Sequence, residues 1–523
     1  MTITGEAIID GVQERGAAGS FQAWNPTARE HLEPSFHMVT PEQIDRACAL
    51  AGAAFDTFRA TSDEQRAQFL DTVAEQILAI GDELIERAMA ETGLPRVRLE
   101  GERGRTVGQL RLFATLLREG SWQDARLDTP LPERAPPRPD LRMRLIGVGP
   151  VAVFAASNFP LAFSVAGGDT ASAFAAGCPV VLKAHSSHPG TSELVGRAVS
   201  KAVAQCGLPA GVFALLTGTG NGIGQRLVAH PAIQAVGFTG SRSGGTALMA
   251  VAAARKQPIP VYAEMSSINP VFILPQALAA RGDEIGKGFA ASLTMGVGQF
   301  CTNPGLVLAI DGPGLDTFVK AAGDALSASQ SAVMLNQGIA DSYRKGVDAL
   351  AGNEAVTTLA RIDHEEGKGG AAFFRTTADE FLKRHELHDE VFGPASVLVV
   401  CQDAQQLRAV AELLEGQLTA TLQIDAGDID AAKALLPALE RKVGRILANG
   451  YPTGVEVSTA MVHGGPFPST ADGRSTSVGT GAISRFLRPV CYQNLPVELL
   501  PEALRDGNPL GIWRRRDGAL TKE

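Results

Sequence analysis

The chain has 523 residues and contains little cysteine, tryptophan or tyrosine, with six, three and four copies respectively. The cysteines lie far apart, at positions 48, 178, 206, 301, 401 and 491. None belongs to a Cys-x-x-Cys motif or to a Cys/His pair at the spacing of a zinc site. We therefore predict neither a disulfide framework nor a metal site, and we consider each thiol on its own.

The sequence also lacks a long apolar run and an excess of positive charge. No stretch approaches the ~20 apolar residues that a membrane-spanning helix needs, and residues 1–20 contain no basic segment followed by an apolar one. The formal net charge is -9, and basic and aromatic residues are not interleaved as they are on nucleic-acid-binding surfaces. We expect a cytoplasmic protein that binds neither nucleic acid nor membranes.

The first part of the chain has helical periodicity, with apolar residues three and four positions apart. This pattern predicts helices over residues 41–59, 64–92 and 105–118. A segment rich in proline and charge follows at 127–139, and residues 141–146 alternate as in an exposed strand.

After Gly147, short continuous apolar runs alternate with stretches of helix length. Such runs are typical of parallel strands that are buried on both faces of a sheet. They occur at 151–155, 180–182, 212–216 and 235–238, and then at 271–274, 307–310 and 396–400. The pattern predicts two doubly wound α/β domains, and the strand-like residues 486–493 precede a polar tail.

A glycine-rich turn follows the apolar run that ends at Gly237. Its sequence is Phe238-Thr239-Gly240-Ser241-Arg242-Ser243-Gly244-Gly245. Glycines between a strand and a helix let backbone N–H groups approach a pyrophosphate at the positive end of the helix. Many strand-to-helix turns are rich in glycine for other reasons, so the turn alone leaves a purely structural role open.

Cys301 is the best candidate for a nucleophile. It stands among small residues, between Gly298-Gln299 and Thr302-Asn303-Pro304-Gly305, so we expect its side chain to be reachable. A thiolate is a strong nucleophile when a cation or a helix terminus lowers its pKa, although an unpaired cysteine is more often a small core residue. Cys178 and Cys401 adjoin strand-like runs and are expected to lie in the core.

Two polar residues strengthen this hypothesis. Glu264 is an acid in the otherwise uncharged stretch 261–270, at the expected junction of the two domains. Asn158 follows a strand of the buried type, which places an amide donor at the carboxyl end of a sheet, where open α/β sheets bind ligands.

Taken together, these features resemble the aldehyde dehydrogenase superfamily over nearly the whole chain. The matching motifs are Asn158-Phe159-Pro160, Lys183, Phe238-Thr239-Gly240-Ser241, Glu264, Gly298-Gln299-x-Cys301-Thr302 and Glu390-x-Phe392-Gly393-Pro394. The resemblance implies an NAD(P)-dependent enzyme that oxidises an aldehyde to a carboxylic acid. It also implies a cofactor-binding domain (1–126 and 147–260), a catalytic domain (261–455) and an oligomerisation element (127–146 and 484–523) in a homodimer or homotetramer.

The resemblance assigns roles to individual residues. Cys301 would attack the aldehyde, Asn158 and the Cys301 backbone N–H would hold the oxyanion, and Glu264 would be the general base. The implied cofactor contacts are Lys183, Ser186, Gly240, Ser241, Gly245, Glu390 and Phe392. Outside this family, Lys183 and Glu390 would be ordinary solvated residues and Phe392 a core residue.

Two departures from common members of the superfamily bear on the cofactor and the substrate. Glu264 is followed by Met265-Ser266-Ser267 instead of Leu-Gly-Gly, and Ser186 stands where an acid usually contacts the adenosine ribose. Without that acid a 2′-phosphate is tolerated, so both NADP and NAD are expected cofactors.

Four motifs resemble the branch that contains the α-ketoglutaric semialdehyde (2,5-dioxovalerate) dehydrogenases. These are Ala263–Pro270, Lys183-Ala-His, Gly416-Gln-Leu-Thr-Ala-Thr421 and Met461-Val-His-Gly-Gly-Pro466. We expect this semialdehyde to be the substrate. The alternatives are an NADP-dependent medium- or long-chain fatty aldehyde dehydrogenase and a non-catalytic member of the same fold.

An α-ketoglutaric semialdehyde carries a carboxylate, so its binding site should offer a cation. Arg105 and Arg111 are candidates, because the corresponding helix of the superfamily lines the substrate entrance, although a solvated helix face is an equal alternative. Phe159 and Gln299 are further expected substrate contacts. His463 resembles a histidine that some members of the branch hold near the nucleophile, and a structural role for it is as well supported.

Overall fold

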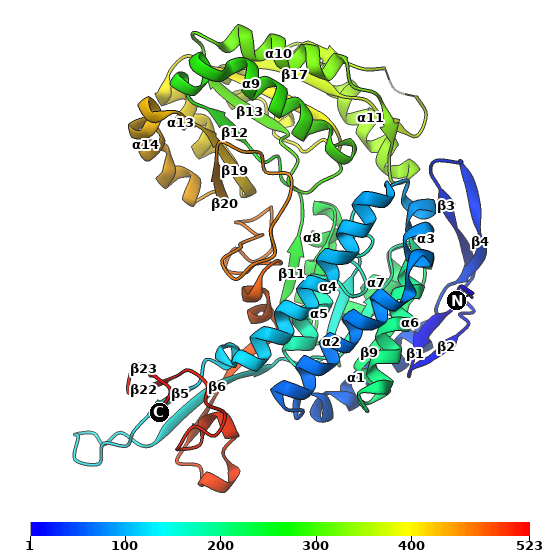
Figure 1. Ribbon diagram of the computed structural model, residues 1–523, viewed down its shortest axis with the longest axis vertical. Helices are drawn as coiled ribbons and strands as arrows, with labels where there is room; N and C mark the ends of the chain where they lie inside the picture. The colour runs from blue at the N-terminus through cyan, green and yellow to red at the C-terminus, as the bar shows by residue number, and fades with distance from the viewer. Residues whose placement is uncertain (1, 364) are drawn as a thin grey trace.

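In the computed structural model the chain forms two α/β bodies and a small β element (Figure 1). The structure describes residues 2–363 and 365–523. The second body lies above the first in the view of Figure 1, and the small element, which contains the C-terminus, projects from the opposite end. The two wound sheets described below confirm the predicted α/β class.

The first sheet has the strand order β11-β10-β7-β8-β9-β1-β2. The strands are β1 (Ala7–Ile9), β2 (Val12–Glu14), β7 (Val151–Phe154), β8 (Val180–Lys183), β9 (Phe213–Leu216), β10 (Ala235–Thr239) and β11 (Val261–Glu264). All are parallel except β1 and β2, which extend one edge in antiparallel fashion. Because β8 and β10 flank β7 on opposite sides, the winding reverses between β7 and β10, and such a switch point is where open α/β sheets bind ligands.

Helices cover both faces of this sheet. They are α1 (Pro41–Arg59), α2 (Asp63–Ile80), α3 (Asp82–Thr92), α4 (Arg96–Glu119), α5 (Gly168–Ala175), α6 (Pro189–Gln205), α7 (Gly222–Ala229) and α8 (Arg242–Ala253). Val151 and Val153 of β7 point into a core with α2, α4, α5 and α6, whereas Ala152 and Phe154 point into a second core with α1, α7 and α8. Burial on both faces explains the continuous apolar runs of the sequence.

The second sheet has the order β15-β17-β18-β13-β12-β19-β20. Its strands are β12 (Val271–Ile273), β13 (Leu306–Ile310), β15 (Thr357–Arg361), β17 (Ala372–Thr377), β18 (Ala395–Cys401), β19 (Gln417–Gln423) and β20 (Val443–Ala448). Its helices are α9 (Pro275–Thr294), α10 (Leu315–Ser327), α11 (Gln337–Ala351), α12 (Ala378–Lys383), α13 (Ala404–Leu413) and α14 (Ile429–Glu440). The sheets divide after Glu264, a few residues beyond the predicted boundary at 260/261, and the functional assignment of the two bodies stays a prediction.

The remaining strands form smaller units. The small β element has the order β21-β6-β5-β22-β23 and joins residues from both predicted oligomerisation segments. Its strands are β5 (Arg126–Asp128), β6 (Leu141–Gly147), β21 (Leu487–Gln493), β22 (Arg514–Arg516) and β23 (Ala519–Thr521). Two further pairs are β3 (Ser20–Asn25) with β4 (Glu30–His37) and β14 (Ala332–Val333) with β16 (Lys368–Gly369). Among the helices of the described chain, none combines the length and the apolar character needed to span a membrane.

Two helix predictions were wrong in their boundaries. Residues 64–92 form two helices, because Gly81 between them adopts a φ of 71° that interrupts the α-conformation. Helix α4 begins at Arg96 and not at residue 105, and its first half buries the polar residues Glu102 and Thr106. Apolar periodicity cannot detect a helix face of that kind.

A buried ion pair fastens the C-terminal part of the chain to the first body. The Arg485 guanidinium donates to the Asp169 carboxylate at 2.7 Å, and both side chains are buried. We expect Asp169→Asn to lower the free energy of unfolding by about 3–5 kcal/mol, because it leaves a buried cation without its counter-ion. The matched control is Asp324→Asn, which removes the exposed pair with Lys320 and should cost less than ~1 kcal/mol. Equal losses in urea unfolding would contradict the structural role of the Asp169 pair.

Candidate active site

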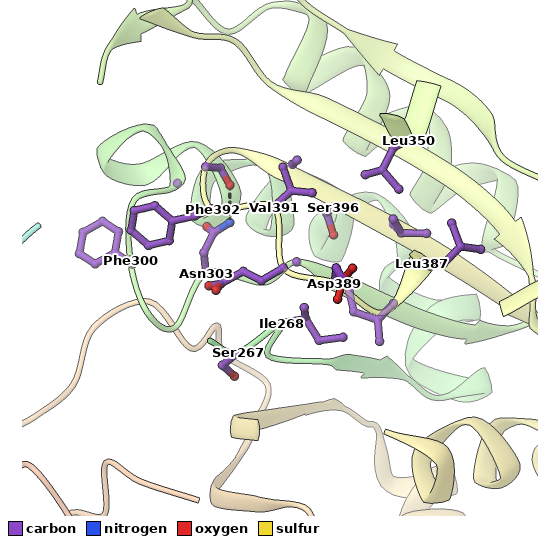
Figure 2. Close-up of a pocket in the computed structure, with 17 residues that line it drawn as sticks. Ser267, Ile268, Phe300, Asn303, Leu350, Leu387, Asp389, Val391, Phe392 and Ser396 are labelled. Carbon is purple, nitrogen blue, oxygen red and sulfur yellow. Dashed lines mark hydrogen bonds between the residues drawn. The ribbon is translucent and has the colours of Figure 1, made fainter. Parts of the chain in front are cut away.

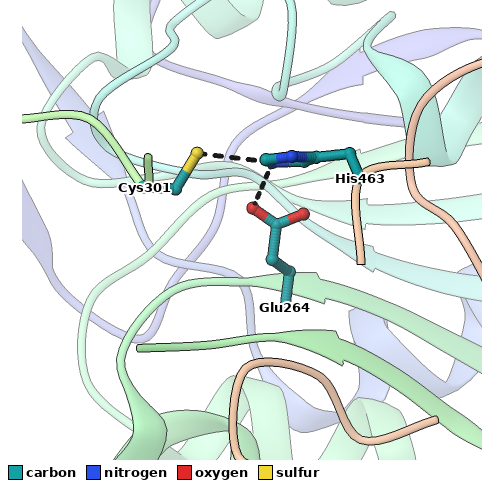
Figure 3. A group of neighbouring side chains, drawn as sticks. All are labelled: Glu264, Cys301 and His463. Atoms are coloured by element: carbon teal, nitrogen blue, oxygen red, sulfur yellow. Dashed lines mark hydrogen bonds and ion pairs between the residues drawn. The ribbon is translucent and has the colours of Figure 1, made fainter. Parts of the chain in front are cut away.

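Glu264, Cys301 and His463 come from distant parts of the chain and meet between the two bodies (Figure 3). Glu264 ends β11 at the carboxyl edge of the first sheet, and Cys301 lies just before β13, at the amino edge of the second. His463 belongs to the long segment that follows β20. The carboxylate, thiol and imidazole atoms of these residues all lie within 4.8 Å of one another.

Glu264 is an ionised carboxylate, and each of its two oxygen atoms has a polar partner. It is only 3% exposed, its Oε1 lies 2.9 Å from Nε2 of His463, and its Oε2 accepts a hydrogen bond from the Ser477 hydroxyl at 2.7 Å. Burial opposes ionisation, but the His463 imidazole, the Ser477 hydroxyl and the Cys301 thiol outweigh it and keep the pKa of Glu264 below its ordinary value. A base that is buried yet charged is available to take up a proton.

Cys301 is partly exposed, and its Sγ lies 3.4 Å from Nε2 of His463. Burial of the sulfur and the negative charge of Glu264 raise the pKa of the Cys301 thiol well above its ordinary value, and Arg105 opposes this rise. The resting thiol therefore keeps its proton, and it becomes a nucleophile when a neighbour accepts that proton.

Asn269 and Gly298 hold the loop that carries Cys301. Nδ2 of Asn269 donates to the backbone oxygens of Cys301 and Asn303, each at 2.9 Å. Gly298 has a φ of 63°, and a Cβ there would lie 2.3 Å from the backbone carbon of Gly393. The turn before Cys301 thus requires glycine, which accounts for the Gly298-Gln299 motif.

Asn158 follows β7 at the switch point of the first sheet. Its Nδ2 donates to the backbone oxygen of Gln299 at 3.1 Å, and the second hydrogen of this amide remains for a ligand. The backbone N–H of Cys301 has no backbone acceptor in the described part of the chain. An amide and a backbone N–H beside a nucleophile are donors suited to a developing oxyanion.

Helix α4 fixes the loop that carries Asn158 through two charged side chains. Nη2 of Arg98 donates to the backbone oxygen of Asn158 at 2.8 Å. Oε1 of Glu102 accepts from the backbone N–H groups of Leu161 and Ala162 at 2.8 and 2.9 Å. The amide of Asn158 is therefore positioned from the helix.

Arg105, on the same helix, has N–H donors without a hydrogen-bond acceptor among the described residues. Its Nη1 donates to the backbone oxygen of Val455 at 2.8 Å, whereas its buried Nε and Nη2 have no partner in the described part of the chain. Arg111 is exposed and lines the same outer pocket as Arg105. Of the two predicted arginines, Arg105 has the unused donors and the electrostatic contact with Cys301.

The two other expected substrate contacts lie in different surroundings. The ring of Phe159 packs against those of Phe163 and Phe300, with centroids 5.3 and 5.7 Å apart. Gln299 is 1% exposed, and its side-chain oxygen accepts from the backbone N–H of Leu335 at 3.0 Å. Phe159 therefore belongs to an aromatic cluster beside Cys301, whereas the side chain of Gln299 is directed into the second body.

The glycine-rich turn after β10 leaves the start of helix α8 open. Gly240 and Ser241 are exposed, and the Ser241 hydroxyl caps the helix by accepting from the Gly244 N–H at 3.1 Å. A helix N-terminus of this kind suits a phosphate group. Gly245 is buried, and a Cβ there would lie 2.6 Å from Sδ of Met265, so packing accounts for its missing side chain.

Lys183 and Glu390 are ionisable residues that have no charged partner among the described residues. Burial lowers the pKa of Lys183 at the end of β8, close to the half-buried Ser186. Burial raises the pKa of Glu390 to about 8, so this carboxyl can donate as well as accept. Glu390 and Phe392 line one pocket together with Phe300 and Asn303, and Figure 2 shows Phe392 beside Phe300 and Asn303. An open helix terminus, a free ammonium group and a protonatable carboxyl fit a dinucleotide.

Several residues of the site were missed in the sequence. They are Arg98, Glu102, Asn269 and Ser477. Arg98, Glu102 and Arg105 share one face of α4 because they are four and three positions apart, and that spacing could have indicated a charged face turned inward. Ser477 had no comparable signal, since its partner Glu264 lies more than two hundred positions away.

Comparison with known proteins is consistent with this geometry. The family model described as "Aldehyde dehydrogenase family" matches residues 13–487. The chain is 59% identical over 522 residues to alpha-ketoglutaric semialdehyde dehydrogenase 2 of Azospirillum brasilense. It is 51% identical over 522 residues to alpha-ketoglutaric semialdehyde dehydrogenase of Acinetobacter baylyi, and both alignments cover 99% of each chain.

Solved structures show the same fold at lower identity. The aldehyde dehydrogenase KauB from Pseudomonas aeruginosa superimposes with a TM-score of 0.81 and 19% identity, over 94% of this chain and 97% of that one.

The hydrogen bond from Ser477 gives a test of the charge on Glu264. We expect Ser477→Ala to shift the acid limb of the pH profile of activity upward, because burial would then raise the pKa of Glu264 with less opposition. The shift should be about one to two pH units, since a hydrogen bond to a charged group contributes roughly 1.5–3 kcal/mol and one pKa unit is ~1.4 kcal/mol. Ser475→Ala is the control, because Ser475 lines the same pocket but bonds to the Asp472 backbone. An unmoved acid limb in Ser477→Ala would refute the role of this hydroxyl.

Proposed function

Because the chain belongs to the aldehyde dehydrogenase family, we propose that it oxidises α-ketoglutaric semialdehyde to 2-oxoglutarate, with NAD or NADP as hydride acceptor. The observation that carries the proposal is the identity of 59%, over 99% of both chains, to a relative that is named for this activity. The overall reaction consumes the aldehyde, one water and the oxidised dinucleotide, and it yields the acid, the reduced dinucleotide and a proton.

In the first step, Cys301 adds to the aldehyde carbon. Its thiol proton passes to the Glu264 carboxylate, directly or through Nε2 of His463, which lies within hydrogen-bond distance of both. The carbon–sulfur bond forms as the carbonyl π-electrons move to oxygen. The free amide hydrogen of Asn158 and the Cys301 N–H then stabilise the negative oxygen, and a donor of this kind contributes ~3–4 kcal/mol.

When bound, the dinucleotide would supply a hydride acceptor to this site, and loss of a hydride from the Cys301 adduct would leave a thioester. Gly240, Ser241 and the start of α8 would hold its pyrophosphate, with Lys183 and Ser186 at the adenosine ribose. Glu390 would hold the other ribose, with Phe392 packed beside it. Gly245 acts by letting α8 approach Met265 closely. Ser186 brings no negative charge to repel a 2′-phosphate, so we propose that both NAD and NADP are accepted.

In the last step, Glu264 acts as a general base on water. Glu264 has by then released the thiol proton to solvent. Its carboxylate, held by Ser477 and His463, takes a proton from a water molecule that attacks the thioester carbon. The carbon–sulfur bond then breaks, Cys301 leaves as thiolate and takes this proton back from Glu264, and the carboxylic acid departs.

Arg105 is the proposed partner of the substrate carboxylate. Its two buried, unpaired nitrogen atoms lie on the helix that also positions Asn158, and a carboxylate can accept from a guanidinium at both oxygens. Arg111 would attract the anion at the rim. A buried guanidinium with spare donors disfavours the alternative of a fatty aldehyde, whose alkyl chain would leave these donors unpaired.

We propose further that the small β element joins chains into a homodimer or homotetramer. Strand β21 lies at an edge of its sheet, and edge strands offer unpaired backbone groups to a partner.

Substitutions of Cys301 and Glu264 distinguish the attack on the aldehyde from the hydrolysis of the thioester. Cys301→Ala should abolish oxidation, because the nucleophile is gone. Glu264→Gln should lose steady-state turnover by at least about a hundredfold while a stoichiometric burst of reduced dinucleotide persists, because Nε2 of His463 lies within reach of the thiol proton. Stopped-flow absorbance of the reduced dinucleotide measures both, and normal turnover in Cys301→Ala would overturn the assignment.

Specificity tests the role of Arg105. We expect the wild-type enzyme to prefer α-ketoglutaric semialdehyde to hexanal in kcat/KM, with succinic semialdehyde and glutaraldehyde for comparison. Arg105→Gln should reduce this preference about 10- to 100-fold, which corresponds to ~1.5–3 kcal/mol for a hydrogen-bonded charge. Arg111→Gln, the control on the same helix, should reduce it much less. A wild-type preference for hexanal would contradict the proposed substrate.

A further inference from the structure

The three side chains at the centre of the site are also three metal ligands. Sγ of Cys301, Nε2 of His463 and a carboxylate oxygen of Glu264 are the donor types that proteins use for zinc. In the part of the chain that the structure describes, these donors converge from three separate elements (Figure 3). Sequence spacing does not indicate this ligand set, because its members are spread over some two hundred positions and lack the short spacing of a zinc motif.

The spacing of the donors suits a tetrahedral ion. With Zn–S near 2.3 Å and Zn–N and Zn–O near 2.0–2.1 Å, the donors around tetrahedral zinc lie roughly 3.3–3.6 Å apart. Sγ of Cys301 and Nε2 of His463 are 3.4 Å apart, and Nε2 and Oε1 of Glu264 are 2.9 Å apart. Sγ of Cys301 and the Glu264 carboxylate lie within 4.8 Å of each other, so shifts of up to about 1 Å would admit the ion.

The surroundings keep these donors in place. Oε2 of Glu264 is held by the Ser477 hydroxyl at 2.7 Å, and the backbone N–H of His463 donates to the Thr476 hydroxyl at 2.9 Å. The hydrogen bond on Oε2 orients the Glu264 carboxylate as a ligand. Three protein ligands leave the fourth position to water, as in an open zinc site.

We propose that Cys301, His463 and Glu264 form a binding site for Zn²⁺ that inhibits the enzyme reversibly. The ion binds to the sulfur, the imidazole nitrogen and the carboxylate, and the thiol proton leaves to solvent with no change of oxidation state. Mg²⁺ and Ca²⁺ do not bind, because they prefer oxygen ligands. Binding rests on the placement of the three donors, and only the inhibition rests on the proposed function.

Binding is measured on metal-free protein by competition with a chromophoric zinc chelator. We expect one Zn²⁺ per chain, at least tenfold weaker binding in Cys301→Ala and in His463→Gln, and no change in Cys206→Ala, which removes a half-buried cysteine outside the site. Co²⁺ should give a thiolate-to-metal charge-transfer band that Cys301→Ala abolishes. Circular dichroism of each variant verifies that it is folded.

Activity is a separate readout. Zn²⁺ should inhibit the wild-type enzyme, a chelator should restore it, and Mg²⁺ should have no effect. Absence of stoichiometric zinc, or zinc binding that both Cys301→Ala and His463→Gln retain, would overturn the proposed site. Stoichiometric zinc at these residues in a chain that oxidises no aldehyde would leave the site intact and refute the proposed function alone.

Discussion

The active site depends on one buried negative charge, the carboxylate of Glu264. In a dry interior such a group would normally stay protonated. Here a hydroxyl from Ser477 and the imidazole of His463 hold it in the ionised form, and the thiol of Cys301 lies beside it. The same charge keeps the thiol protonated at rest. In the resting site, this arrangement keeps Glu264 ionised and available as a base, and it keeps the Cys301 thiol protonated.

Each of the two α/β bodies contributes one partner of this interaction, from the end of a strand or from the loop before one. Glu264 ends a strand of the first sheet, and Cys301 precedes a strand of the second. Strand β11 is fixed further because Glu264 forms a bridge with Thr470, in the segment that also brings in His463. Around this centre, helix α4 holds the loop of Asn158 through Arg98 and Glu102. Each reactive group is therefore supported by a different element, which gives the site its rigidity.

Much of this arrangement could be predicted from the sequence. The buried parallel strands were visible as continuous apolar runs, and Cys178 and Cys401 are in the core as expected. Cys301 was singled out by its small neighbours, Glu264 as an acid in an uncharged stretch and Asn158 as an amide that follows a buried strand, and the family resemblance then assigned their roles. The inward charges of α4, the hydroxyl of Ser477 and the amide of Asn269 could not be predicted in this way. Their partners are distant in sequence. Without knowledge of the partner, the sequence does not distinguish a buried polar residue from a polar residue on the surface.

In the resting site, Cys301 is a neutral thiol beside an ionised Glu264. The most direct test is the rate of Cys301 alkylation by iodoacetamide as a function of pH, followed by mass spectrometry of the peptide that contains it. The rate should still be rising above pH 9, the ordinary thiol value that burial and Glu264 raise, and Glu264→Gln should move the curve to lower pH. A rate that is already constant at neutral pH, with no effect of Glu264→Gln, would show that Cys301 rests as a thiolate that does not interact with Glu264.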